Sequence, residues 1–375
     1  MEHLVLHGRI NASGQVLFDR LWAEENAAGQ ATLWAASSAT GSLVQMTLQE
    51  GLAADRDGVS WLSSGDDSFY FGDLETGADR VLVADRASGL VSLLDWSDGT
   101  APRRVGFLQD QQGNALMLDA MSLLPGGSTP LLAATPADRD GALLLYRLNA
   151  AMDRATLLTS IGDTSKSTLT GVSEMVSLRL GDTDFVVSAS SSEDGLTSYA
   201  IVNNQLELRD TLGPKDGLWI SGMEDIATLD VGGQIFIVGV SAQSNTMSAV
   251  RINPVGAMFI TDIAMDDLNT RFAGAVALDT FETHGRSFVV TGGTDNGVAL
   301  FELLPGGQLL HHHSQAQGAS WDIGHVRDIS ATVIGDEVQI LLAGSETNGL
   351  VQMVLPLAQM GDLTRGTGAA DILNG

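Results

Sequence analysis

This chain of 375 residues is short of several residue types, and each shortage excludes a class of protein. It has no cysteine, which excludes a disulfide scaffold, a cysteine nucleophile and a thiolate metal site. Only 19 residues are Lys or Arg, against 46 Asp or Glu, and the formal net charge is −27. Binding to nucleic acid or to an anionic membrane surface needs basic residues that replace counterions, so we expect neither partner.

Long apolar runs are also missing. No stretch of 18 consecutive apolar residues occurs, so the sequence predicts no membrane span. The first ten residues, MEHLVLHGRI, have neither the basic leader nor the apolar core of a Sec-type signal peptide. What the chain does have is 44% hydrophobic residues with only 17% charged ones, which is enough material for a large folded core.

One pattern occurs seven times along the chain: an apolar strand, a polar turn usually closed by glycine, and a second apolar strand. Examples are VLVADRASGLVSLLDW (81 to 96) and FVVTGGTDNGVALFEL (288 to 303). Successive turns are separated by 48, 52, 54, 51, 51 and 52 residues. Six of the seven turn positions are glycine, which predicts a positive φ there, and the exception follows an asparagine, the next most tolerant residue. The turn residues are Gly41, Gly89, Gly141, Gly195, Thr246, Gly297 and Gly349.

Each repeat has room for two further strands, one upstream such as 174 to 180 and one downstream such as 206 to 212. Four short strands in about 50 residues are typical of a β-propeller blade. The last repeat lacks its fourth strand, and residues 4 to 10 form a strand without a sheet. We therefore predict an all-β, seven-bladed propeller over residues 1–357, closed by the N-terminal strand, with a tail at 358–375. The competing interpretations are a β-sandwich and a six-bladed ring with one irregular unit.

Ligands of propellers usually bind at one end of the central channel, on the loops that lead into the innermost strands. Acidic residues occupy these loops in five repeats. Three lie 21 residues before the turn position, and two lie 22 before it, which predicts a different facing. Converging carboxylates would suit a hard cation, whereas carboxylates that accept backbone N–H groups would only stabilise the local chain, and we favour the second interpretation. The aligned residues are Glu174, Asp225 and Asp328, and the displaced ones are Asp19 and Asp119.

Histidine and aromatic residues supply weaker candidates. His325 lies on such a loop and is the candidate for proton transfer. The run 311 to 313 is His-His-His on an expected outer strand, where we expect surface side chains. Trp219, Phe272 and Trp321 precede a glycine at matching points of three repeats, and they predict either a stacking surface for sugars or core packing between blades, of which we favour the core. No G-x-S-x-G, H-E-x-x-H or phosphate-binding loop motif occurs.

The last ten residues, GTGAADILNG, resemble one copy of the G-G-x-G-x-D-x-L-x-G repeat of RTX calcium-binding proteins. Gly366, Gly368 and Asp371 match the calcium-binding half of that repeat, while Thr367 and Ala369 depart from it. One copy supplies only half of a coordination shell, because each ion lies between successive turns. Segments such as HGRSFVVTGGTDNGVALFELLPGGQLLH (284 to 311) are also similar to the N-terminal propellers of secreted RTX proteins of marine alphaproteobacteria.

The resemblance implies a secreted protein, exported by a type I system, that uses Ca²⁺. We accordingly expect a non-enzymatic recognition or scaffold propeller whose partner is an extracellular glycan or protein surface. Two alternatives stay open: a propeller hydrolase of lactonase type that uses a channel-bound divalent metal, and a glycan-binding adhesin with Trp219 and Trp321 exposed together. The sequence leaves the oligomeric state open.

Overall fold

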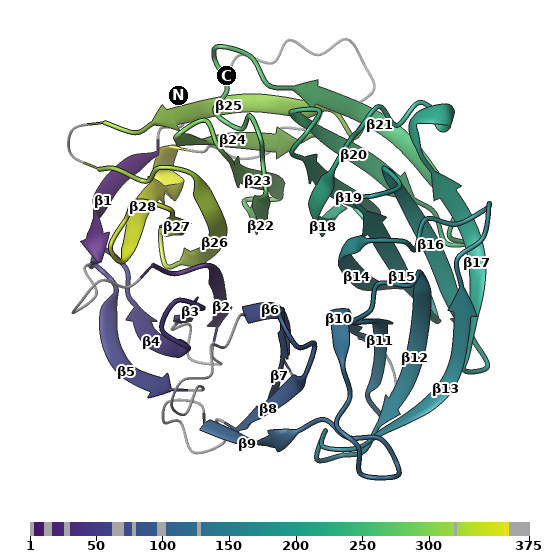
Figure 1. Ribbon diagram of the computed structural model, residues 1–375. Coiled ribbons are helices and arrows are strands. Elements are labelled where there is room, and N and C mark those ends of the chain that lie inside the picture. The colour runs from purple at the N-terminus through teal and green to yellow at the C-terminus, as the bar shows by residue number, and fades with distance from the viewer. Residues whose placement is uncertain are drawn as a thin grey trace.

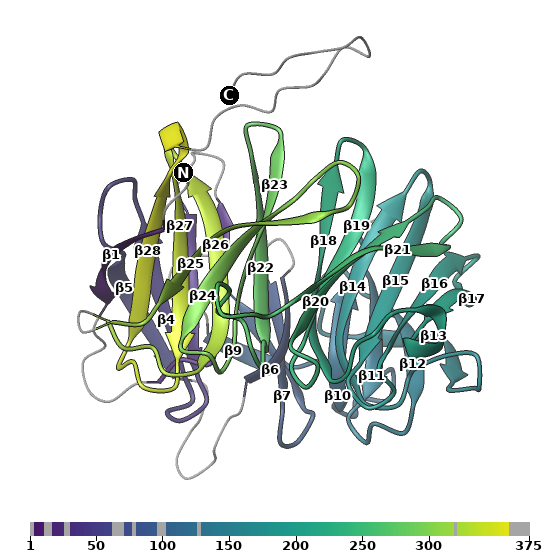
Figure 2. The same ribbon diagram turned by 90° about the horizontal axis from the view of Figure 1, so that it is seen from above.

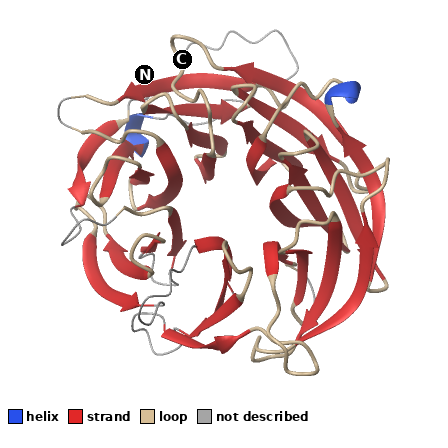
Figure 3. Ribbon diagram, in the orientation of Figure 1, coloured by secondary structure: helices blue, strands red, loops and turns tan. Residues whose placement is uncertain are grey.

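The computed structural model describes residues 4–10, 17–25, 31–61, 71–76, 80–95, 103–125, 129–318 and 321–359. Within these residues, 28 strands form seven sheets of four antiparallel strands each, and the only helices are two 3-10 turns (Figure 3). The turns are η1 (Pro214–Asp216) and η2 (Leu357–Gln359). The sheets stand around a central axis as the blades of a propeller (Figure 1), and the turned view shows the blades side by side around the ring (Figure 2). The predicted seven-bladed propeller is confirmed.

Each blade is named here from its innermost strand outward. Blade 1 contains β2 (Arg20–Glu25), β3 (Ala31–Ser37), β4 (Ser42–Leu48) and β5 (Asp55–Trp61). Blade 2 contains β6 (Phe71–Thr76), β7 (Arg80–Asp85), β8 (Val91–Asp95) and β9 (Arg103–Phe107). Blade 3 contains β10 (Leu118–Leu123), β11 (Leu131–Pro136), β12 (Ala142–Leu148) and β13 (Ala155–Gly162). Blade 4 contains β14 (Val172–Leu180), β15 (Thr183–Ser190), β16 (Gly195–Val202) and β17 (Gln205–Leu212).

The remaining three blades complete the ring. Blade 5 contains β18 (Met223–Val231), β19 (Gln234–Ser241), β20 (Thr246–Ile252) and β21 (Met258–Met265). Blade 6 contains β22 (Ala277–Thr283), β23 (Arg286–Gly292), β24 (Gly297–Leu303) and β25 (Leu309–Ala316). Blade 7 contains β26 (Val326–Ile334), β27 (Glu337–Gly344), β28 (Leu350–Pro356) and β1 (Val5–Ile10).

The N-terminal strand closes the ring. β1 pairs antiparallel with β28, from Val5 opposite Val354 to Ile10 opposite Leu350, so the two lie side by side in purple and yellow (Figure 1). The preceding Leu4 is only 4% exposed and belongs to the core between blades 6 and 7. This pairing confirms the predicted closure and covers the edge of β28 that would otherwise be open to another chain.

The hydrophobic core is divided into seven clusters, and each lies between two neighbouring blades. The middle strands of a blade therefore pack on both faces. All seven residues of β24 are buried, whereas the outer strand β17 has mostly exposed or half-buried residues. Two-sided packing explains why the second and third strands are near-continuous apolar runs in the sequence rather than alternating ones.

The repeated turn glycines serve two different physical purposes. Gly41, Gly89, Gly141 and Gly349 have the positive φ that the sequence predicted. In blades 4, 5 and 6 the positive φ falls one residue earlier instead, on Asp194, Asn245 and Asn296. The expectation was therefore wrong for Gly195 and Gly297, which are needed for space: a Cβ on Gly297 would lie 2.6 Å from the carbonyl oxygen of Gln315.

Aspartates that follow β-bulges join neighbouring blades. In the outer strands, Arg209 and Thr261 are the extra residues of two bulges, and an aspartate follows each. Asp210 Oδ2 accepts the N–H of Met258 in the next blade at 2.8 Å, and Asp262 Oδ2 accepts that of Leu309 at 2.8 Å. A carboxylate thus satisfies a backbone donor that the neighbouring blade leaves unpaired.

Candidate functional site at the channel mouth

One end of the central channel opens into a cavity of about 550 Å³, which we call the channel mouth. Every blade contributes to its lining. The loops and first residues of the innermost strands supply Asp19, Arg20, Asp119, Ala120, Ser173, Glu224, Asp225, Val276, His325, Val326 and Arg327. The turns between second and third strands supply Ser38, Arg86, Arg139, Ser191, Thr294 and Ser345.

A second cavity of about 440 Å³ lies along the innermost strands β2, β22 and β26. It shares Arg20 and Asp225 with the channel mouth, so the two cavities adjoin at these residues. Its lining adds Asp279 and Asp328, which makes the inner channel acidic apart from Arg20.

The structure brings three of the five predicted acidic residues to the mouth. Asp19, Asp119 and Asp225 line it, and Asp328 lines the second cavity instead. Glu174 lines neither of these cavities, and its Oε1 accepts the N–H of the adjacent Met175 at 3.0 Å. The five acids therefore do not form one ring of carboxylates.

Bulges at the start of the innermost strands explain this arrangement. In blades 4, 5 and 7 the extra residue is Ser173, Glu224 or Arg327, and all three face the mouth. A bulge places two residues opposite one and turns the extra side chain toward a site. The position 22 residues before the turn, which also holds Asp19 and Asp119, is therefore the one that lines the mouth in five blades. The strict alignment of the other position had suggested the opposite.

Three channel aspartates hydrogen-bond across blade boundaries. Asp225 Oδ2 accepts the N–H of Leu278 at 2.9 Å, and this bond joins blades 5 and 6. Asp328 Oδ2 accepts the N–H of Leu21 at 2.6 Å, which joins blades 7 and 1. These contacts agree with the favoured interpretation that the acids accept backbone N–H groups, although the donors belong to the neighbouring blade rather than to the local turn.

The sequence analysis missed the third of these aspartates. Asp279 Oδ2 accepts the N–H of Ala331 at 2.8 Å and joins blades 6 and 7. Asp279 lies 18 residues before Gly297, so a count from the turn glycine does not find it. The signal that was available is chemical: an aspartate inside an otherwise apolar innermost strand.

Burial shifts the protonation of these carboxyls. It raises the pKa of Asp279 to about 7, although hydrogen bonds from the N–H groups of Ala331 and Thr280 oppose the shift. It raises the pKa of Asp328 to about 6, against the attraction of the Arg20 guanidinium. Burial also raises the pKa of Asp225, and the nearby Asp328 adds to this effect while the Leu278 N–H opposes it. The inner channel therefore changes its charge close to neutral pH.

Basic residues gather at the mouth, although the chain has few of them. Four of its 17 arginines line this one cavity: Arg20, Arg86, Arg139 and Arg327. Arg139 Nε lies 2.6 Å from Asp119 Oδ2 and forms an ion pair with it. The chain as a whole carries a charge of −27, so this cavity differs in charge from the rest of the surface.

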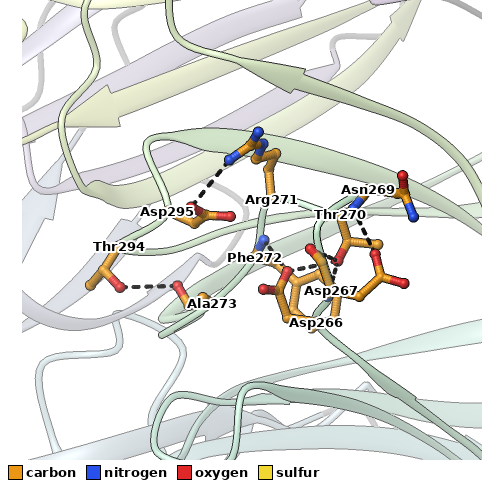
Figure 4. A network of polar contacts seen from close by, with 9 residues as sticks. All are labelled: Asp266, Asp267, Asn269, Thr270, Arg271, Phe272, Ala273, Thr294 and Asp295. Atoms are coloured by element: carbon orange, nitrogen blue, oxygen red, sulfur yellow. Dashed lines mark hydrogen bonds and ion pairs between the residues drawn. The ribbon is translucent and has the colours of Figure 1, made fainter.

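A polar network fixes the loop that leads into blade 6 (Figure 4). Asp266 Oδ1 accepts the hydroxyl of Thr270 at 2.7 Å and the N–H of Phe272 at 3.0 Å. The hydroxyl of Thr294, a mouth residue, donates to the carbonyl of Ala273 at 3.1 Å. The loop is thereby tied to the turn beside it, and this part of the mouth is preorganised.

The three predicted aromatic residues have different environments. Trp219 is 73% exposed, whereas Phe272 and Trp321 are 0% and 2% exposed. Phe272 contacts Phe301 edge-on at 5.6 Å between ring centres, in the core between blades 5 and 6. A stacking surface formed by Trp219 together with Trp321 would need both rings at the surface, and only one is there.

The histidines also differ from one another. His325 is exposed at the mouth. The run 311 to 313 lies half-buried on β25 rather than on the surface, contrary to the expectation: His312 Nε2 is 2.8 Å from Glu302 Oε2, His311 Nε2 is 2.7 Å from Ser314 Oγ, and the N–H of Leu4 donates to His313 Nδ1 at 3.3 Å. Each ring has a structural partner because β25 packs against its neighbours.

Two findings concern the remaining candidates. Across the described part of the chain, no group of three or more His, Cys, Asp or Glu side chains is placed to hold a metal ion, and no helix is long and apolar enough to span a membrane. Gly366, Gly368 and Asp371, the candidate calcium residues of the tail, lie outside the described residues.

The fold and the mouth define the chain as a seven-bladed β-propeller with a polar, mixed-charge cavity at one end of its axis. No protein-family model matches the sequence, and no curated protein shows significant similarity to it. The resemblance to RTX proteins accordingly depends on the sequence segments quoted above alone.

Proposed function

We propose that this chain is a non-enzymatic recognition propeller that binds its ligand at the channel mouth. The observation that carries the proposal is the lining of that cavity, to which all seven blades contribute side chains. Its volume of about 550 Å³ is that of a small-molecule site and accommodates a small polar molecule or one terminal sugar. Polar and charged side chains that converge from a rigid ring are suited to selective binding.

The environment of the channel carboxylates supports recognition rather than metal-dependent hydrolysis. One oxygen of Asp225 and one of Asp328 already accept a backbone N–H from the next blade. A metal ion bound to those oxygens would have to replace hydrogen bonds that hold the ring together. A hydrolase of lactonase type would therefore use ligands that also serve the stability of the fold.

We further propose that the propeller belongs to a secreted, calcium-binding protein of RTX type. The support is the similarity of residues 284 to 311 to RTX-associated propellers and of GTGAADILNG to the RTX repeat. The absence of cysteine and the strongly acidic composition are compatible with folding outside the cell, where millimolar Ca²⁺ neutralises carboxylates. An extracellular glycan or a protein surface is the corresponding partner. Calorimetric titration of the chain with CaCl₂, followed by EDTA, measures the calcium part of this proposal.

A mouth-blocking variant tests the recognition function. Val276 lines the mouth and is 37% exposed, so Val276→Trp narrows the cavity without removing a side-chain hydrogen bond. Val255, exposed in the loop between β20 and β21, gives the control Val255→Trp. We expect ligands found by a glycan array and by ligand-observed NMR to bind the wild type and V255W but not V276W. Ligands that bind V276W unchanged, or turnover of a lactone and ester panel that V276W abolishes, would contradict the proposal.

A further inference from the structure

The arginines of the channel mouth come from four blades that are neighbours in the ring. Arg327 belongs to blade 7, Arg20 to blade 1, Arg86 to blade 2 and Arg139 to blade 3. They are far apart in the sequence and converge only because the ring closes between blades 7 and 1. One side of the mouth is thus rich in guanidinium groups.

Two of these guanidinium groups are available to a ligand. Arg139 is paired with Asp119, and Arg20 interacts electrostatically with Asp225 and Asp328 in the channel. Arg86 and Arg327 are exposed, and neither makes a hydrogen bond or ion pair with a residue that the structure describes. Arg86 follows β7 and Arg327 is the bulge residue of β26, so the two flank blade 1.

The acidic residues beside them do not neutralise this pair. Both carboxylate oxygens of Asp19 face the N–H of Ser38, at 3.0 and 3.4 Å. Asp119 is held by Arg139. Glu224 lies on β18, across the ring from β2 and β6 (Figure 1). The positive charge of Arg86 and Arg327 therefore remains uncompensated on one side of the cavity.

From this arrangement we infer that the ligand is a small molecule carrying an oxyanion, a carboxylate or a sulfate or phosphate ester, which Arg86 and Arg327 bind at the mouth. A guanidinium offers a planar pair of N–H donors that matches the two oxygens of such a group, and charge-assisted bonds of this kind are among the strongest hydrogen bonds in proteins. The inference rests on the proposed function, since it names the ligand class of the same cavity.

The charge of the whole chain makes this site selective. At a net charge of −27 the general surface repels anions, so an anion that binds must be held by local contacts. A large polyanion would meet the repulsive surface around the mouth as well as the two arginines. A single anionic group on a small molecule meets mainly the arginines, which is why the inference names a small ligand.

Glucuronate, glucose 6-sulfate, inorganic phosphate and neutral glucose are the probes that test the inference. Isothermal titration calorimetry at constant ionic strength measures their affinity for the wild type and for R86A/R327A. We expect at least one anionic probe to bind, glucose to bind at least tenfold more weakly than its charged counterpart, and R86A/R327A to lose at least tenfold in affinity for that anion. The control is Arg147→Ala, because Arg147 is an exposed arginine on the outer part of blade 3 without a partner among the described residues.

The outcomes separate this inference from the proposed function. Preference for the carboxylate over the sulfate or phosphate probe, or the reverse, identifies which oxyanion is recognised and supports the inference. If none of the anions binds, or if R86A/R327A binds them as the wild type does, the inference is wrong. The recognition function nevertheless stands if a neutral ligand binds and V276W abolishes that binding. If anions bind equally to the wild type, V276W and R86A/R327A, both proposals fail.

Discussion

The carboxylate of Asp328 accepts the backbone N–H of Leu21 at 2.6 Å, and this hydrogen bond joins the last blade of the ring to the first. Asp225 and Asp279 make the corresponding contacts at the two preceding blade boundaries. The channel of this propeller is therefore lined by carboxyls whose first role is to hold adjacent blades together. Their charge also makes the stability of the ring sensitive to pH.

Replacement of Asp279 by asparagine is expected to change how stability depends on pH. Burial raises the pKa of Asp279 to about 7, whereas an aspartate in the unfolded chain titrates near 3.9, so between these pH values the folded state keeps a proton that the unfolded state has released. This stabilising contribution is complete below about pH 4 and is lost as pH rises to about 7, by at most about 1.4 kcal/mol per pH unit. Relative to D279N, the wild type should lose unfolding free energy across this window in urea titrations.

A surface carboxylate provides the comparison for that measurement. Asp182 is exposed in the turn between β14 and β15, so D182N removes one carboxylate without touching the channel. Its unfolding free energy should follow that of the wild type from pH 4 to 7. If the curves of D279N and the wild type also run parallel, Asp279 does not hold its proton in the folded state.

The N-terminal segment offers a matched pair of substitutions for the ring closure. Leu4 is 4% exposed in the core between blades 6 and 7, while the adjacent Val5 is 50% exposed. Leu4→Ala should lower the free energy of unfolding by about 2–3 kcal/mol, because the lost side chain leaves a cavity in a closed core. Val5→Ala should cost no more than about 0.5 kcal/mol. Equal effects of the two changes in chemical denaturation would show that Leu4 does not anchor the closing strand.

A buried ion pair in blade 6 should matter more than a surface pair of the same kind. Arg286 donates to both oxygens of Glu302, at 3.0 and 2.7 Å, and His312 bonds to the same carboxylate. Burial alone would raise the pKa of Glu302, but the hydrogen bonds from His312 and Arg286 outweigh it and lower that pKa to about 2. Arg286→Ala leaves this charge with one fewer partner and should cost about 3–5 kcal/mol.

The surface comparison is the pair of Arg209 and Glu207 on β17, with 2.7 Å between Arg209 Nη2 and Glu207 Oε2. Arg209→Ala should cost less than about 1 kcal/mol because water screens the pair. The double variant R286A/E302A should be more stable than R286A alone, since it removes the buried charge. A loss in R286A no larger than that in R209A would contradict the structural role of the buried pair.

Much of the fold could be predicted from the sequence, and much less of the site. Trp219 and Trp321 stand at the same distance before a glycine, yet one is exposed and the other is buried. Glu174 and Asp225 align equally well, yet only Asp225 reaches the mouth. A bulge shifts which side chain faces the channel by one residue, and because strand residues alternate between faces, such a shift reverses a prediction made by counting.

The sequence by itself determined the number of blades, their second and third strands, and the closure by residues 4 to 10, because a repeated apolar strand, turn and apolar strand buries two faces in only one kind of ring. The tertiary structure decided what the channel holds. Arg86 and Arg327 are separated by most of the chain and face one cavity only after blade 7 meets blade 1. Local pattern encodes each blade, whereas the chemistry of the axis depends on side chains that the closed ring brings together.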